Sequence, residues 1–189
     1  NSRFAIEPLD VRVLERLRAN EADMAFFPAT ELPPDFHSLR IYRSKKGILV
    51  RDGHPVIEAY EKAGVMTWEL LNRWPAVCVT AGMKDGGAKS VEGRRVGVVL
   101  PYFLTVPYVV ARTDFTFEGP LITLRRFMMD SQFQFRILPM PEESGPFEPR
   151  LVWHHCSHTD PFLQWVRGLV VDAARSEARL LGVIDTSEE

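Results

Sequence analysis

Cysteine is scarce in this sequence: Cys78 and Cys156 are the two cysteines among 189 residues. Two thiols cannot build the disulfide framework of small secreted domains, and they suit a reducing compartment such as the cytoplasm. No apolar run approaches the ~20 residues that cross a bilayer. Positive charge is not in excess either, because the formal net charge is −2. The chain therefore has no electrostatic basis for wrapping nucleic acid, which needs clustered Lys and Arg.

The motifs of common enzyme classes are missing as well. The stretch "DGGAKS" at 85–90 lacks the glycine spacing of a phosphate-binding P-loop, and no G-x-S-x-G nucleophile turn occurs. No acid–base or nucleophile constellation stands out by its spacing. We therefore expect no enzymatic activity, no bound cofactor and no metal site.

Strand-like and helix-like segments alternate along the sequence. Residues 3–9 alternate between polar and apolar side chains, Asp10 can cap the helix that follows, and 24–27 is a continuous apolar run. This order predicts a parallel crossover with a buried second strand, and the alternation as a whole predicts the α/β class. Further strands are expected within 39–53 and at 76–82, 94–101, 115–120, 135–141 and 150–156. Helices are expected at 56–62, 67–71, 102–113, 121–133 and after Asp160, the last with Phe162, Val166, Leu169, Val170 and Ala173 on its packed side.

The stretch "RLVWHHCSHTDPFLQWVR", which begins at Arg150, holds three histidines and one cysteine within five positions. Side chains alternate between the faces of a strand, so His154 and His155 cannot bind one ion together, while Cys156 shares a face with His154. A zinc site would need further ligands from elsewhere, and a cysteine nucleophile would need a base brought near it by the fold. The pattern favours a strand that packs one face inside, followed by a helix that begins at 160–161.

Four segments resemble, in the same order, the effector-binding domain of LysR-type transcriptional regulators. "LRANEADMAFFP" is similar to the family segment L-x-x-G-E-x-D-L-A-I, with Asn20 where glycine is usual. "LRIYRSKKGILVRDGHP" resembles the paired strand that ends in His-Pro, and "VVLPYFLTVPYVVARTDFTFEGP" resembles a helix and short strand of the second lobe. "LVWHHCSHTDPFLQWVRGLV" resembles the return strand and final helix of regulators of aromatic degradation and nodulation.

The resemblance implies two α/β lobes joined by two crossover strands, like a type 2 periplasmic binding protein. Lobe I would comprise 1–53 and 151–182, without the family's first strand and helix; lobe II would comprise 54–150, and 183–189 would be a C-terminal tail. Such a domain senses a small molecule and controls DNA binding through a winged helix-turn-helix that these residues do not contain. The resemblance also implies a cytoplasmic homo-oligomer, with paired effector domains and a tetramer for the full-length regulator, and no membrane partner.

The resemblance places the effector in the cleft between the lobes. Tyr102 and Phe103 can stack on a flat ring, and Asp10 would occupy backbone donors that an anionic ligand needs. We therefore expect a neutral or phenolic aromatic effector. The residues that the resemblance places at this site are Leu9, Asp10, Pro28, Thr80, Pro101, Tyr102 and Phe103.

Other interpretations stay open on the sequence alone. A solute-binding protein has the same fold, an enzyme would turn over its ligand, and a purely structural oligomerisation domain would show no ligand-dependent stabilisation. Tyr102 and Phe103 can also be ordinary core residues, because aromatic burial needs no ligand.

Overall fold

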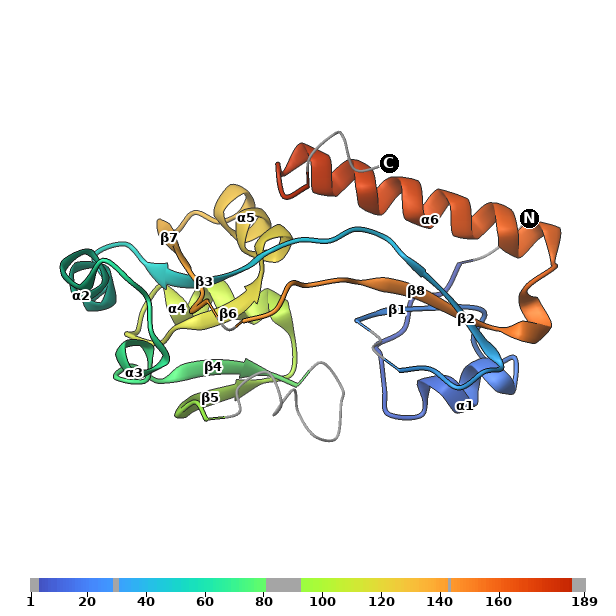
Figure 1. Cartoon of the computed structure of the whole chain (residues 1–189), viewed down its shortest axis with the longest axis horizontal. Helices are drawn as coiled ribbons and strands as arrows, with labels where there is room; N and C mark the ends of the chain where they lie inside the picture. The colour runs from blue at the N-terminus through green and yellow to red at the C-terminus, as the bar shows by residue number, and fades with distance from the viewer. Residues whose placement is uncertain (1–3, 29–30, 81–92, 143, 185–189) are drawn as a thin grey trace.

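The structure is a computed structural model that describes residues 4–28, 31–80, 93–142 and 144–184. Two groups of elements lie side by side along the longest axis (Figure 1). The first group contains α1 (Val13–Arg18), β1 (Ala25–Phe27), β2 (Phe36–Arg40), β8 (Arg150–His154), η3 (His155–Ser157) and α6 (Pro161–Leu180). The second contains β3 (Lys46–Arg51), α2 (Pro55–Ala63), α3 (Trp68–Leu71), β4 (Ala76–Val79), β5 (Val96–Leu100), η2 (Phe103–Thr105), α4 (Val106–Val110), β6 (Phe117–Pro120), α5 (Leu121–Asp130) and β7 (Phe135–Pro139).

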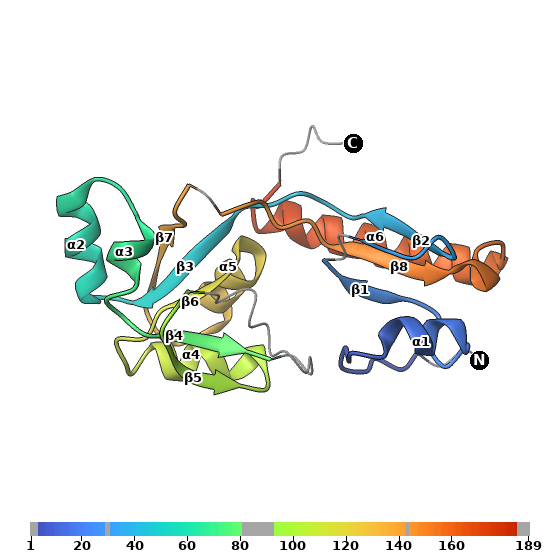
Figure 2. The same ribbon diagram turned by 60° about the horizontal axis from the view of Figure 1, so that its bottom comes forward.

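The sheet of the first group has the order β1-β8-β2, with both pairs antiparallel. Its two faces follow from the alternation of side chains along β8. Val152 packs with Leu17 of α1, whereas Leu151 and Trp153 belong to the cluster that α6 covers. The sheet therefore lies between α1 and α6, as Figure 2 shows.

The second group is built around β3, which pairs antiparallel with β6 and β7. The parallel pair β4-β5 joins this sheet where the Val77 N–H donates to the Thr116 carbonyl at 2.8 Å. Alternate residues of β3 again face opposite ways: Leu49 packs in the cluster with α4 and α5, and Ile48 packs in the cluster with α2 and α3. Both faces of this sheet are thus covered by helices.

Two connectors, 41–45 and 140–149, join the groups and run beside each other. The Ile41 N–H donates to the Pro149 carbonyl at 2.9 Å, and Ser44 and Phe147 exchange backbone hydrogen bonds of 2.9 and 2.8 Å. A second junction is formed by α5 and α6, where the Arg126 guanidinium pairs with the Glu177 carboxylate. The expected two crossover segments are therefore present.

The start of the chain differs from the expectation. Residues 4–9, the described part of the expected strand 3–9, form no strand, because no strand of the described chain hydrogen-bonds to them. The expected parallel crossover is therefore wrong: β1 pairs antiparallel with β8. The expected burial is also wrong, because β1 has a single partner in the described sheet and the Phe26 side chain is exposed.

Three further expectations need correction. β3 was expected in lobe I, but its hydrogen bonds place 46–51 in the sheet of the second group. β8 ends at His154 instead of 156, because 155–157 form a 3₁₀ turn. In the expected tail, Val183 and Ile184 pack against the cluster under α6.

The last helix begins as expected, because the Asp160 Oδ1 accepts from the Leu163 N–H at 2.9 Å and Pro161 follows in the first turn. Its packed side is only partly the expected one. Val166 and Val171 are buried, whereas Phe162, Leu169 and Ala173 are exposed. Apolar residues occur on both sides of this helix, so spacing alone did not identify the packed side. No helix among the described residues is long and apolar enough to span a membrane.

Candidate functional site

Four of the expected site residues meet at one end of the parallel pair β4-β5. Parallel strands end at the same edge, so Thr80 follows β4 beside the end of β5, and its N–H donates to the Leu100 carbonyl at 3.0 Å. Pro101, Tyr102 and Phe103 continue from β5 into η2. The side chains of Tyr102 and Phe103 are 63% and 42% exposed, so their interpretation as buried core residues is wrong. This edge offers two accessible aromatic rings.

The other three residues lie in the first group. Leu9 and Asp10 precede α1, and Pro28 is exposed at the end of β1. The expected helix cap at Asp10 is wrong, because α1 begins at Val13 and its N-cap residue is Arg12, without a side-chain cap hydrogen bond. The Asp10 Oδ1 instead accepts from the Arg12 N–H at 2.7 Å in the turn before the helix. No hydrogen bond, ion pair or ring contact within the described chain joins Leu9, Asp10 or Pro28 to the residues on β4 and β5. The seven expected residues thus lie in two separate sets, one in each group of elements, which are called half-sites below.

A cavity of about 340 Å³ lies beside Phe103. Leu104, Ile122 and Phe127 give it apolar walls, and the Arg126–Glu177 ion pair joins α5 to α6 at its rim. Sequence reasoning missed these residues because nothing in the spacing of Arg126 and Glu177 indicates that they meet. The cavity can hold a small, mostly apolar group against Phe103.

The histidine-rich stretch forms a cluster at the far end of the first sheet. His37 on β2 lies between His155 and His158: its Nε2 is 2.9 Å from His155 Nδ1, and its ring stacks on the His158 ring with centroids 3.9 Å apart. The Trp153 Nε1–H donates to His158 Nδ1 at 3.2 Å, and the Arg167 guanidinium lies 4.6 Å from the Trp153 ring centroid. We call these five residues the histidine cluster.

His154 lies outside the stack and joins a second group of polar side chains. Its Nε2 is 3.3 Å from Asp35 Oδ2, and its Nδ1 is 3.0 Å from the Cys156 Sγ. A hydrogen bond from Arg18 lowers the pKa of Asp35 to about 2. The side-chain alternation expected for 154–156 does not apply beyond His154, and the turn brings Cys156 back to His154. Within the described residues, no group of three or more His, Cys, Asp or Glu is arranged to hold a metal ion.

Two histidines with lowered pKa, His37 of the histidine cluster and His54, predict that the protein loses stability in mild acid. Burial, followed by His158 and His155, lowers the pKa of His37, and burial also lowers that of His54. As the pH falls below about 6.5, the unfolded chain gains protons that the folded chain binds less readily, so stability present above that pH is lost. Urea unfolding followed by circular dichroism should give a smaller free energy of unfolding at pH 5.5 than at pH 7.5.

The variant His37→Gln provides the control for this pH dependence. It removes one of the two shifted histidines, so its loss between pH 7.5 and 5.5 should be smaller than that of the parent chain. Asp35 does not interfere, because its pKa of about 2 lies far below this window. Identical pH dependence in the two proteins would contradict the assignment to His37.

Comparison with known proteins matches residues 3–175 to the family model of the LysR substrate binding domain. The HTH-type transcriptional regulator SyrM 1 of Sinorhizobium fredii (strain NBRC 101917 / NGR234) is 27% identical over 169 residues, 85% of this chain and 48% of that protein. SyrM of Rhizobium meliloti (strain 1021) is 31% identical over 175 residues, 89% of this chain and 52% of that protein. The chain thus spans about half the length of these relatives.

Solved structures agree on the fold. The regulatory domain of MexT, a transcriptional activator in Pseudomonas aeruginosa, has a TM-score of 0.64 and 23% identity, covering 84% of this chain and 77% of that one. The effector binding domain of QuiR in complex with shikimate has a TM-score of 0.64 and 12% identity, covering 88% of this chain and 79% of that one. The expected two-lobed fold, similar to that of periplasmic binding proteins of type 2, is confirmed.

Proposed function

The chain belongs to the LysR substrate binding domain family, and on this basis we propose that it senses a small effector for a transcriptional regulator. The observation that carries the proposal is the accessible pair Tyr102 and Phe103 at the carboxyl ends of β4 and β5, where ligands bind in open α/β folds. The relatives SyrM 1 and SyrM are transcriptional regulators, which favours regulation over solute carriage or catalysis.

The effector site we propose lies between two lobes. In this proposal lobe I contains the β1-β8-β2 sheet with α1 and α6, lobe II contains the sheet around β3, and we place the boundaries in 41–45 and 140–149. Two adjacent connectors allow the lobes to move relative to each other. An effector that binds one arrangement more tightly shifts the population toward it, and this shift is the signal.

An aromatic effector that is neutral or phenolic fits the half-sites. Stacking on Tyr102 or Phe103 contributes roughly 0.5–1.5 kcal/mol beyond area burial. The Asp10 carboxylate, which already accepts from the Arg12 N–H, would repel an anionic ligand at that end.

The remaining properties follow from family membership. We propose that DNA is contacted by a helix-turn-helix domain outside these residues, because the relatives are HTH-type regulators of about twice this length. We further propose that the effector domains pair in a cytoplasmic homo-oligomer and that the chain catalyses no reaction.

A thermal-shift screen with phenols, aromatic acids and flavonoid-like compounds tests the sensing function. A compound at about 100 times its dissociation constant should add about 2.7 kcal/mol of apparent stability. Phe103→Ala and Asp10→Ala should reduce this stabilisation, because each alters one half-site. Phe162→Ala, a similarly exposed phenylalanine on α6, should leave it unchanged.

Two results would count against this assignment. If Phe103→Ala and Asp10→Ala stay folded and keep the full shift from a confirmed effector, the cleft is not the binding site. If a bound compound is chemically converted, the chain is an enzyme and the sensing function is wrong.

A further inference from the structure

A second, larger cavity lies at the junction of the two lobes, away from Tyr102 and Phe103. Its volume is about 930 Å³, within the range of roughly 300–1,000 Å³ for small-molecule sites. Its walls come from the first connector, the start of α5, the end of β7, the second connector and 182–184 after α6. Both connectors and both lobes therefore contribute to this junction cavity.

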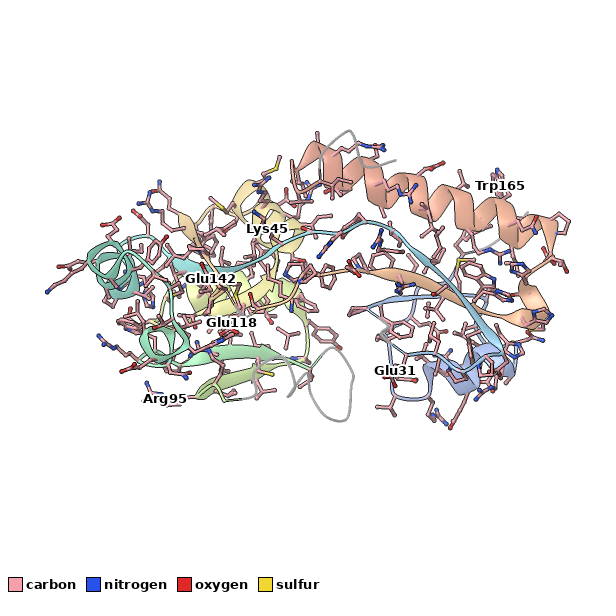
Figure 3. All side chains as sticks on the ribbon, in the orientation of Figure 1. Glu31, Lys45, Arg95, Glu118, Glu142 and Trp165 are labelled. Carbon is pink, nitrogen blue, oxygen red and sulfur yellow. The ribbon has the colours of Figure 1, made fainter. Side chains whose placement is uncertain are left out.

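Positive charge predominates in the junction cavity. Among the described residues that line it, four are cationic, Arg43, Lys45, Lys46 and Arg125, and one is a carboxylate, Glu142. The chain as a whole has a net charge of −2, so the excess of positive charge is confined to this part of the molecule. Figure 3 shows Lys45 and Glu142 in the part of the molecule where the connectors enter lobe II.

Much of this positive charge is not neutralised by the protein. Among the described residues, no hydrogen bond or ion pair is formed by the ammonium groups of Lys45 and Lys46. Arg125 donates to the carbonyls of Leu181 and Gly182, which are neutral acceptors and leave its charge uncompensated. Arg43 has a carboxylate partner, Glu148, at 3.4 Å, and the charge of Lys46 acts on the Glu118 carboxylate, where it opposes the rise in pKa caused by burial. In the described part of the chain, Lys45 and Arg125 are thus the lining cations that no carboxylate compensates.

The rest of the wall is apolar. Leu121 and Ile137 line the lobe II side, and Val183 and Ile184 line the side under α6. A bare inorganic ion would fill little of this volume, whereas an organic anion can contact the cations and the apolar wall together. Lys and Arg are the side chains that bind phosphate and carboxylate groups by charge-assisted hydrogen bonds.

We propose that the junction cavity is a second ligand site, which binds a small organic anion carrying at least two negative charges. This ligand differs in charge from the neutral or phenolic compound proposed for the cleft, so the two sites bind different chemistry. Because its walls include both connectors, an anion that fits one arrangement of the lobes better than another biases their relative position. The site stands on the junction cavity and its charges, independently of the effector cleft.

Isothermal titration with citrate and with glycerol 3-phosphate tests the proposal, using the chain of residues 1–189 at constant ionic strength set with sodium chloride. At least one probe should bind saturably with a stoichiometry of one. The double variant Lys45→Gln/Lys46→Gln should raise the dissociation constant at least tenfold, because it removes two of the four cations that line the junction cavity. Glu142→Gln should lower it at least twofold, because it removes a carboxylate that repels the anion.

Lys62→Gln, an exposed lysine on α2 outside the junction cavity, is the matched control and should bind like the parent chain. If the double variant does not fold, the exposed Lys45→Gln alone should still weaken binding at least threefold. The proposal is overturned if neither probe binds beyond the effect of chloride, or if the lysine variants bind as tightly as Lys62→Gln. If the parent chain binds an anion but none of the aromatic compounds, the effector site proposed for the cleft between the lobes is wrong and the anion site in the junction cavity stands.

Discussion

Arg94→Met should be among the most destabilising single substitutions in lobe II, lowering the free energy of unfolding by about 3–5 kcal/mol. The Arg94 and Glu118 side chains are 1% and 7% exposed, with Nε and Oε1 2.5 Å apart. Arg94 also donates to Asn72 Oδ1 at 2.6 Å and Thr116 Oγ1 at 2.8 Å. Removing the guanidinium leaves a buried carboxylate whose pKa burial already raises. Urea unfolding followed by circular dichroism measures the loss.

The neighbouring Arg95 gives a matched control for this substitution. Its side chain is exposed and donates to the Arg73 carbonyl, so Arg95→Met should change stability by less than about 1 kcal/mol. Adding Glu118→Gln to Arg94→Met should recover part of the loss, because it removes the unpaired charge. Equal effects of the two arginine substitutions would contradict the importance of the buried pair.

Trp153→Ala should destabilise lobe I by about 3–5 kcal/mol, the range for deleting a buried aromatic side chain. Trp153 is 8% exposed and packs in the cluster under α6 with Leu151 and Val171. The Arg167 guanidinium stacks on the Trp153 ring, and the Trp153 Nε1–H donates to His158 Nδ1. The substitution therefore leaves a cavity and removes the contacts of Trp153 with Arg167 and His158. Chemical unfolding of the variant measures the resulting loss of stability.

Trp165 provides the same residue type in an exposed place. It is 57% exposed on α6, with its side chain on the outer side of that helix (Figure 3). Trp165→Ala should therefore change the free energy of unfolding by within about 0.5 kcal/mol. If Trp153→Ala proved no more destabilising than Trp165→Ala, the packing role given to Trp153 would be wrong.

Local sequence signals determined most elements of this protein. His54 and Thr67 accept from backbone N–H groups at the starts of α2 and α3, and Asp160 does so at the start of α6. These caps act within a few residues, so the sequence carries them directly. The apolar runs of β3 and β4 can also be read directly from the sequence, as can the order of motifs that indicated the family. The accessible aromatic pair after β5 was found in this way, through the resemblance.

Only the tertiary structure decided how distant segments meet. The direction of β1 depends on β8, more than a hundred residues later, and the packed side of α6 depends on which apolar stripe the sheet covers. His37 enters the histidine cluster although no pattern around it indicates a partner. The junction cavity likewise combines cations from the first connector, β3 and α5. Such contacts depend on the packing of whole elements against one another, and no property of a short stretch of sequence encodes that packing.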